Sequence, residues 1–281
     1  MELFAQRRPG AGRAVAITGA AGGLGSATCR RLAGHGWTVI AADLPGDGLD
    51  QLAAVPGIGV VPLDVTDPAD VVAFGETVSA RTGGLGGVVN FAGILEVGPM
   101  IEMPEHVLRR LIEVNLFGTF RVNQALFALI ERGRGRIVNI SSETGWQSGG
   151  PFNGAYGMSK HAIEAYSDSL RRELMFLDVP VIKIQPGPFR TAMVESVLGR
   201  FQSAERGSTR FGSLLRRTGE LAAAEQDRAH DPRLLARIVE RALTSARPRA
   251  AYSVRPAPSR VALEWLPTRL ADRAIREVLS R

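Results

Sequence analysis

The chain has 281 residues, 45% of them hydrophobic, and a formal net charge of +6 at pH 7, which fits one globular α/β domain or two smaller ones. It holds no run near the ~18 apolar residues of a membrane span and no apolar signal segment at its start, so we expect a cytoplasmic protein without integral membrane association. Its arginines are interspersed with acidic residues, which argues against a nucleic acid partner, and Cys29 with four scattered histidines offers neither a disulfide nor a metal-ligand spacing.

Short apolar runs alternate with segments of helical periodicity along most of the chain. Strands are predicted at residues 13–18, 37–42, 58–62, 87–90, 136–141, 179–185 and 250–254. Helices are predicted at residues 26–34, 67–81, 104–131, 156–177, 191–225 and 231–246, with two short ones within 256–281. Strands that are apolar throughout and alternate with helices indicate an α/β fold, in which helices cover both faces of a parallel sheet.

A glycine-rich turn joins the first predicted strand to the first predicted helix. Its glycines, Gly19, Gly23 and Gly25, allow a pyrophosphate to approach the backbone, and the helix N-terminus behind them supplies N–H groups. Such a turn can also serve packing alone. Asp43, at the end of the next predicted strand, favours the dinucleotide interpretation, because a carboxylate there accepts hydrogen bonds from the ribose of NAD and repels the 2′-phosphate of NADP. No arginine lies in the glycine turn or directly after Asp43 to bind that phosphate.

Tyr156 and Lys160 stand four residues apart at the start of a predicted helix, so they share one of its faces. Lys160 is one of only two lysines among 34 cationic residues, which indicates a need for a compact ammonium. An ammonium near a phenol lowers the phenol pKa from its ordinary value of about 10 and allows proton transfer near neutral pH. A tyrosine four residues before a lysine is common, so the pair on its own favours two ordinary helix residues.

Six motifs in order resemble those of the short-chain dehydrogenase/reductase family, over about residues 13–192. They are Thr18-Gly-x-x-x-Gly23-x-Gly25, Asn90-Phe-Ala-Gly93, Asn115, Ser141-Ser142, Tyr156-x-x-x-Lys160 and Pro186-Gly187-x-x-x-Thr191. The resemblance implies a single Rossmann-type domain over residues 1–281 with a doubly wound, seven-stranded parallel sheet. It also implies hydride transfer between a nicotinamide cofactor, here NAD, and an alcohol or carbonyl.

The resemblance also implies roles for particular residues. Tyr156 would be the general acid/base, Lys160 would lower its pKa and hold the nicotinamide ribose, and Ser142 would bind the substrate oxygen. Asn115 would position a water in a proton relay. The cofactor would contact Gly19, Gly23, Leu24, Gly25, Asp43, Asp64, Val65, Asn90, Ala92, Gly93, Tyr156, Lys160, Pro186, Gly187 and Thr191.

One spacing departs from the family pattern. Ser142 lies fourteen residues before Tyr156, where thirteen is the commoner distance, and residue 143 is Glu, which cannot replace a neutral hydroxyl. We interpret the difference as an extra residue in the loop from Trp146 to Gly154, with Ser141 as the alternative serine.

The last third of the chain is expected to determine the substrate. Residues 192–230 would form a substrate lid and residues 256–281 a C-terminal helical extension. This extension is amphipathic and basic, which is compatible with a membrane surface, but its mixed charges favour docking on the domain or on a partner subunit. The following apolar side chains would line the substrate pocket or pack the lid: Met193, Val194, Val197, Leu198 and Phe201, with Trp146 and Phe152 at the same cleft. Segments 164–174 and 185–191 resemble the retinol, hydroxysteroid and 3-hydroxybutyrate dehydrogenase branch, which implies a small apolar secondary alcohol or ketone as substrate.

Two other functions remain open from the sequence. One is a dinucleotide-sensing binding protein, which would be expected to lose Tyr156 or Lys160. The other is a non-redox enzyme of the family, an epimerase or dehydratase. The long helices predicted at 104–131 and 155–177 resemble those that pair subunits in this family, so we expect a homodimer or homotetramer.

Overall fold

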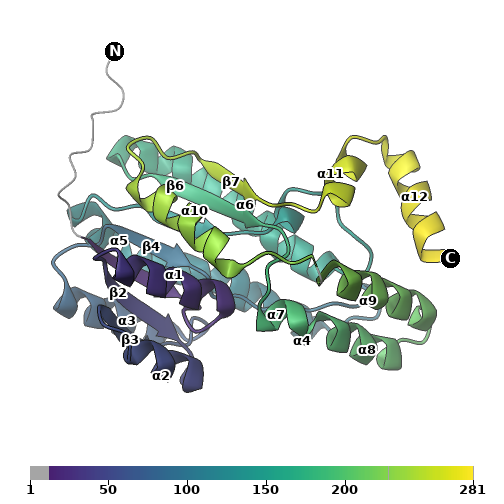
Figure 1. The fold of residues 1–281 in the computed structure, drawn as a ribbon, viewed down its shortest axis with the longest axis horizontal. Helices are drawn as coiled ribbons and strands as arrows, with labels where there is room; N and C mark the ends of the chain where they lie inside the picture. The colour runs from purple at the N-terminus through teal and green to yellow at the C-terminus, as the bar shows by residue number, and fades with distance from the viewer. Residues whose placement is uncertain (1–12, 227, 281) are drawn as a thin grey trace, which may run out of the picture.

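A computed structural model describes residues 13–226 and 228–280, and its centre is a seven-stranded sheet in the order β3-β2-β1-β4-β5-β6-β7, with every neighbouring pair parallel (Figure 1). The strands are β1 (Ala14–Thr18), β2 (Thr38–Asp43), β3 (Ile58–Pro62), β4 (Gly87–Asn90), β5 (Ile137–Ile140), β6 (Val181–Pro186) and β7 (Ala251–Val254). The order reverses between β1 and β4, so the sheet is doubly wound, as the sequence predicts.

The helices include those expected from the periodicity of the sequence. They are α1 (Gly23–Gly34), α2 (Asp47–Ala53), α3 (Pro68–Arg81), α4 (Glu105–Ile112), α5 (Thr119–Arg132), α6 (Gly154–Leu174), α7 (Ala192–Glu195), α8 (Val197–Gly207), α9 (Gly212–Gln226), α10 (Pro232–Thr244), α11 (Pro258–Glu264) and α12 (Thr268–Ser280). Single turns of 3-10 helix occur at η2 (Glu143–Gly145) and η3 (Met175–Leu177).

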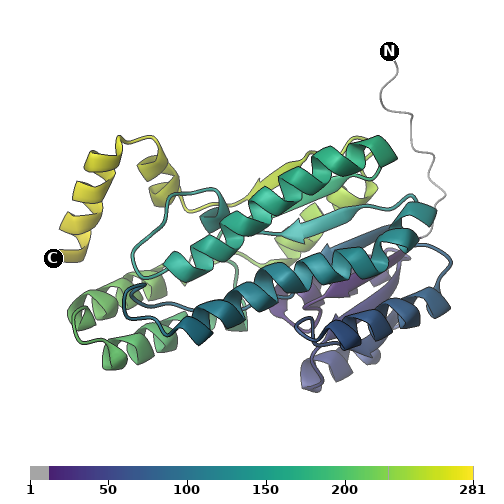
Figure 2. The same cartoon turned by 180° about the vertical axis from the view of Figure 1, so that it is seen from behind.

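Alternate side chains of the buried strands enter two separate hydrophobic cores. Val15 and Ile17 of β1 pack on one face against α1 and α10. Ala16 of the same strand belongs to the other core, beneath α3, α5 and α6 (Figure 2). Because both faces are covered, the strands are apolar at consecutive positions, and this is why the sequence shows runs rather than alternation.

The helix predicted over 104–131 is interrupted in the structure. A π-helix, η1 (Glu113–Gly118), separates α4 from α5. A Cβ on Gly118 would lie 2.6 Å from the side chain of Val65, so the π-helix packs closely on the segment that follows β3. Single turns of π-helix often accompany functional sites, and this one carries Asn115.

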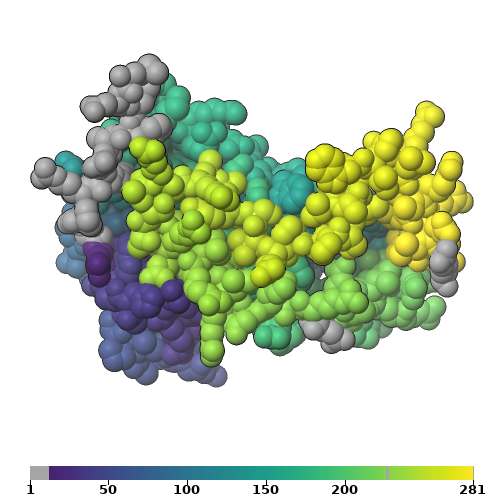
Figure 3. Space-filling model, turned by 45° about the horizontal axis from the view of Figure 1, so that its top comes forward, coloured from purple at the N-terminus to yellow at the C-terminus, as the bar shows by residue number. Residues whose placement is uncertain are grey.

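Helices α7, α8, α9, α11 and α12 lie outside the layers that cover the sheet (Figure 1). The segment 191–225 is three helices, α7, α8 and α9, and α12 packs beside α9. Figure 3 shows the C-terminal residues, in yellow, above the green surface of these helices at one end of the molecule. Among the described residues, no helix is both long enough and apolar enough to cross a membrane.

Candidate active site

A cavity of about 920 Å³ lies at the carboxyl ends of the central strands. Its lining begins at the glycine turn, includes the ends of β2, β4 and β5, and closes on the residues that follow β6. The carboxyl edge of a doubly wound sheet, where the strand order reverses, is the usual place for a ligand in this architecture.

The glycine turn forms a cradle that side chains would fill. Gly19 has φ +64°, and a Cβ there would overlap the backbone of Ala92. A Cβ on Gly25 would overlap the carbonyl oxygen of Gly19, and one on Gly23 would come within 2.8 Å of Thr191. The turn and the first residues of α1 therefore lie close to both β4 and the loop after β6, with α1 directing its N-terminus into the cavity. This arrangement fits a dinucleotide pyrophosphate.

Asp43 and Asp64 line the same part of the cavity. Asp43 accepts hydrogen bonds from the amides of Ala21 and Leu44, both at 2.8 Å. Asp64 accepts from the hydroxyl of Thr66 at 2.7 Å and from its amide at 2.8 Å, and these bonds hold the Asp64 pKa below its ordinary value. Two acidic groups are thus fixed beside the cradle, as the sequence predicts.

Arg109 and Arg110 also line this cavity, although the sequence analysis did not identify them. They lie on α4, far in sequence from both the glycine turn and Asp43. Arg109 pairs with Glu105 one turn earlier on the helix, and Arg110 acts electrostatically on Asp64. No local motif marks them, because only the packing of the crossover helix brings them to the cofactor end of the cavity.

Ser142 and Tyr156 both line the cavity. The Ser142 hydroxyl lowers the pKa of the Tyr156 phenol, whereas the Ser141 hydroxyl donates to the carbonyl oxygen of Lys160 at 3.5 Å. These surroundings favour Ser142 over Ser141 as the partner of Tyr156, despite the spacing of fourteen residues.

The pKa of Tyr156 differs from the sequence expectation. Burial raises the pKa of this phenol to about 12, the hydroxyl of Ser142 lowers it, Glu143 raises it and Arg260 lowers it. Lys160 was expected to lower it, but the Lys160 ammonium is 5.7 Å from the centroid of the Tyr156 ring, and desolvation dominates in this structure. Tyr156 is therefore held as a neutral phenol at neutral pH.

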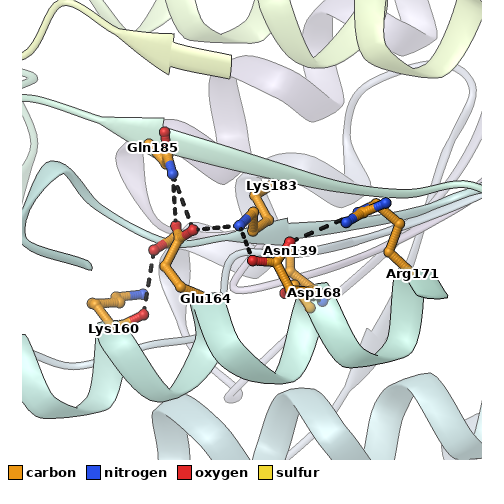
Figure 4. A network of polar contacts seen from close by, with 9 residues as sticks. Asn139, Lys160, Glu164, Asp168, Arg171, Lys183 and Gln185 are labelled. Atoms are coloured by element: carbon orange, nitrogen blue, oxygen red, sulfur yellow. Dashed lines mark hydrogen bonds and ion pairs between the residues drawn. The ribbon is translucent and has the colours of Figure 1, made fainter. Parts of the chain in front are cut away.

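Lys160 lines the cavity but is largely buried, with only 6% of its surface exposed. Its ammonium donates to the carbonyl oxygen of Ile140 at 2.9 Å. Burial lowers the pKa of Lys160 to about 8, while the carboxylate of Glu164 raises it. Figure 4 shows Glu164 between the two lysines of the chain, with Lys183 at 2.7 Å and the Gln185 amide at 3.0 Å from its oxygens.

Asn115 stands behind the cavity wall rather than on it. Its Oδ1 accepts from the amide of Ile94 at 2.7 Å, and its Nδ2 donates to the Ile94 carbonyl and to the Ser159 hydroxyl, both at 3.0 Å. Ser159 in turn donates to the carbonyl oxygen of Tyr156 at 2.8 Å. Asn115 thus links the loop after β4 to the first turn of α6.

Asn90 was expected to line the cofactor site, and the structure places its side chain elsewhere. Its amide donates to Asn123 at 2.8 Å and to Asn139 at 2.9 Å, in a buried network between β4, α5 and β5. At this strand end the side chain of Asn90 turns away from the cavity, and Asn90 is not among the residues that line it. The remaining cofactor residues predicted from the sequence all line the cavity: Gly19, Gly23, Leu24, Gly25, Asp43, Asp64, Val65, Ala92, Gly93, Tyr156, Lys160, Pro186, Gly187 and Thr191.

The apolar lid residues divide between two positions. Met193 and Val194 line the cavity. Phe201 is 4% exposed and, with Leu198, packs against Gly219 between α8 and α9. Phe152 packs edge-to-face on Phe211, directly before α9, with ring centroids 5.7 Å apart.

Comparison with known proteins identifies the family to which this chain belongs. The family model described as short chain dehydrogenase matches residues 13–200, and the chain belongs to that family. The proteins of this family are oxidoreductases that act on CH–OH groups and use a nicotinamide dinucleotide.

The most informative relatives are named dehydrogenases. The chain is 36% identical over 255 residues to retinol dehydrogenase 16 of Homo sapiens, which covers 85% of this chain and 79% of that protein. It is 34% identical over 283 residues to 17-beta-hydroxysteroid dehydrogenase type 6 of Homo sapiens, with coverages of 92% and 86%.

Solved structures show the same fold. A short-chain dehydrogenase from Streptomyces avermitilis superposes with a TM-score of 0.77 at 26% identity, over 96% of both chains. An actinorhodin polyketide ketoreductase variant solved with NADPH gives a TM-score of 0.74 at 27% identity, over 86% of this chain and 95% of that one.

Proposed function

We propose that the protein interconverts an apolar secondary alcohol and its ketone, with NAD as the hydride carrier. The observation that carries this proposal is that Ser142, Tyr156 and Lys160 line the same cavity as the glycine cradle. A dinucleotide that extends from the cradle would bring its reactive ring to this hydroxyl pair. When bound, the nicotinamide supplies the hydride acceptor or donor.

The chain's own residues move the proton. In oxidation, the phenolate of Tyr156 accepts the proton of the substrate hydroxyl, which Ser142 orients by a hydrogen bond. In reduction, the neutral phenol donates that proton to the carbonyl oxygen. Because burial raises the pKa of Tyr156 to about 12, we expect reduction to proceed at neutral pH and oxidation to accelerate as the pH rises.

Asp43 supports NAD rather than NADP. Its carboxylate lines the cradle at the end of β2, where a ribose hydroxyl would be a donor and a 2′-phosphate would be repelled. Arg109 and Arg110 provide positive charge in the same cavity, which favours a phosphate. The preference for NAD over NADP therefore depends on the balance between Asp43 and these two arginines, which a titration can measure.

Fluorescence titrations with NADH and NADPH test this preference directly. We expect NADH to bind at least about tenfold more tightly, a difference of roughly 1.4 kcal/mol. Asp43→Ala should reduce that ratio, because the variant lacks the repelling carboxylate. Tighter NADPH binding by the wild type would assign Arg109 or Arg110 to the phosphate and refute the NAD proposal.

The substrate class follows from the lid and the relatives. Met193, Val194 and Ile94 present apolar side chains to the cavity, and the printed names of the two human relatives refer to retinol and a hydroxysteroid, both largely apolar alcohols. We therefore infer that residues 192–230 are the substrate lid and that small apolar secondary alcohols and ketones are the compounds to screen.

Tyr156→Phe separates catalysis from binding. We expect turnover to fall by about 10³-fold or more, because the proton donor is absent, while the dissociation constant of NADH stays within about twofold. Retained turnover would refute the role of Tyr156. Tight NADH binding without any turnover in the wild type would favour a dinucleotide-sensing binding protein.

We also propose a homodimer or homotetramer that associates through α5 and α6. Phe117 and Phe120 lie on this side of the molecule and are 44% and 38% exposed. Light scattering at micromolar concentration is the test, and a monomer would refute the proposal.

A further inference from the structure

Glu143 is a buried carboxylate next to the reacting hydroxyl groups. It directly follows Ser142 in η2, it is 6% exposed, and it acts electrostatically on Tyr156. Burial of a carboxylate is costly unless hydrogen bonds and an opposite charge compensate it. The buried carboxylate of Glu143 therefore requires both hydrogen-bond donors and a positive charge near it.

Its partners come from the C-terminal extension, outside the matched family segment 13–200. Oε2 of Glu143 accepts a hydrogen bond from the amide of Ala257 at 2.7 Å, directly before α11. Oε1 of Glu143 is 3.4 Å from Nη1 of Arg260, on the first turns of α11. The carboxylate is thus held by a backbone amide and a guanidinium of the same short helix.

A second contact attaches the far end of α11 to the same loop. The carboxylate of Glu264 accepts from the amide of Ser148 at 2.8 Å and from its hydroxyl at 3.0 Å. Because α11 is attached at both ends, the position of Arg260 is fixed relative to Ser142 and Tyr156. Arg260 also acts electrostatically on Tyr156, with the opposite sign to Glu143.

We propose that Glu143 and Arg260 are positioning residues: a charge pair, supplied from the loop after β5 and from α11, that fixes the Ser142 loop and sets the charge beside the Tyr156 hydroxyl. This inference rests on the proposed role of Tyr156 as the proton carrier. The pair acts through Tyr156 and does not itself touch the substrate.

Two other charged groups lie in the surroundings of Tyr156 and of the charge pair. Lys160 lies on the same helix, one turn on, and Glu225 of α9 interacts electrostatically with both Glu143 and Arg260. Neither changes in the variants below, so any shift can be assigned to the pair itself.

The pair predicts opposite effects from its two members. Glu143→Gln keeps an oxygen for the Ala257 amide and removes a negative charge, so the pKa of Tyr156 should fall. Arg260→Gln removes the compensating positive charge, so the pKa of Tyr156 should rise. We expect shifts of about one unit in each direction, and a smaller shift in the double variant.

Tyrosinate absorbance reports the ionisation of Tyr156 without any need for turnover. Difference spectra against Tyr156→Phe isolate this phenol from the other two tyrosines of the chain. At one alkaline pH, Glu143→Gln should contain more tyrosinate than the wild type, and Arg260→Gln less. The rising limb of kcat/KM for alcohol oxidation should move to lower and higher pH respectively.

Glu264→Gln is the matched control, because it removes a charge from α11 while the charges of Glu143 and Arg260 stay. Glutamine keeps an oxygen that can accept from Ser148, so the tyrosinate fraction and the pH profile should shift less than in either charge variant. Arg260→Lys, which retains the cation, should restore the wild-type profile and covers the case in which Arg260→Gln does not fold.

Two outcomes would overturn the inference: shifts of the same sign in both variants, or no shift in either. Opposite tyrosinate shifts in a protein that oxidises no alcohol would support the charge pair and refute the proposed function alone. Alcohol oxidation with unshifted profiles in both variants would refute the pair alone.

Discussion

The cofactor side of the cavity and its lid side are held together by different kinds of interaction. On the cofactor side, backbone packs on backbone, and a Cβ at Gly19 or Gly25 would overlap neighbouring main-chain atoms. On the lid side, charged side chains join segments that are distant in sequence. Arg200 of α8 pairs with Glu96 at 2.8 Å, and Glu102 accepts from Ser208 at 2.6 Å.

This difference determines what each side tolerates. Backbone contacts cannot relax by a change of rotamer, so the cradle keeps one shape. Partly exposed ion pairs contribute about 0.2–1 kcal/mol each, so the lid can change its residues or its position at little cost. A rigid cofactor site beside an adaptable lid allows the substrate to vary while hydride chemistry is retained.

The largest effect on NADH binding is expected from an added methyl group in the cradle. Gly25→Ala places a Cβ against the carbonyl oxygen of Gly19, which must displace the turn. We expect NADH binding to weaken by at least about 100-fold, or roughly 2.7 kcal/mol, in a fluorescence titration, together with a lower Tm.

Gly34→Ala provides the control within the same helix. A Cβ there meets no atom within 4 Å, so we expect unchanged NADH binding and a stability gain of up to about 1 kcal/mol, since alanine favours the helix. Equal NADH affinities for the two variants would contradict the description of the cradle as rigid.

The next largest effect is expected in the network beneath Lys160. Lys183 contacts Glu164 at 2.7 Å and Asp168 at 2.9 Å, with only 10% of its side chain exposed. Lys183→Met leaves the Glu164 carboxylate with less compensation, and we expect a loss of about 2–3 kcal/mol in the free energy of unfolding at pH 7. Lys183→Arg keeps the charge and should lose less.

The pH dependence of this loss distinguishes charge from packing. Burial lowers the pKa of Lys183, but its two carboxylate partners raise it further, so the pKa lies above its ordinary value in the folded protein. The stabilisation is therefore fully present below the unfolded pKa of about 10.4 and is lost as the pH rises through the folded pKa. The test is urea denaturation of the wild type and Lys183→Met at pH 7 and at a pH above the folded pKa of Lys183. An equal difference in the free energy of unfolding at the two pH values would indicate packing instead.

The smallest effect is expected at the lid. Arg200→Gln removes one ion pair whose members are 34% and 33% exposed, so we expect KM for the alcohol to rise by about two- to threefold with NADH affinity unchanged. Glu96→Gln should give the same change, and the double variant should add little to either. A tenfold change in NADH affinity would show that the lid is coupled rigidly to the cradle.

The arrangement of the sheet could be predicted from the sequence because burial of both faces leaves its mark on every strand. Apolar runs identified β1 to β7 in chain order, and the end of a strand identified Asp43, whereas the role of Ser142 was implied by the family resemblance. The glycine turn could be identified because a Cβ atom does not fit at these positions, so the sequence must have glycine there.

Other features depend on distances that a linear pattern does not contain. Helix α2 (Asp47–Ala53) is too short to show a periodicity and was not predicted. Asn90 was assigned to the cofactor, but its side chain bonds Asn123 within the core. The raised pKa of Tyr156 follows from burial, which no spacing of charged residues reveals.

The contact between Gly187 and Arg255 has a consequence for synthesis of the chain. A Cβ on Gly187 would overlap the carbonyl oxygen of Arg255, so the loop that closes the cofactor site packs directly on the residue that follows β7. Chains emerge from the ribosome N-terminal end first, and β7 is the last strand to appear. A nascent chain halted before Arg255 therefore carries every family motif but not the wall that holds the Gly187 loop, and full NADH binding should appear only after the C-terminal residues leave the exit tunnel.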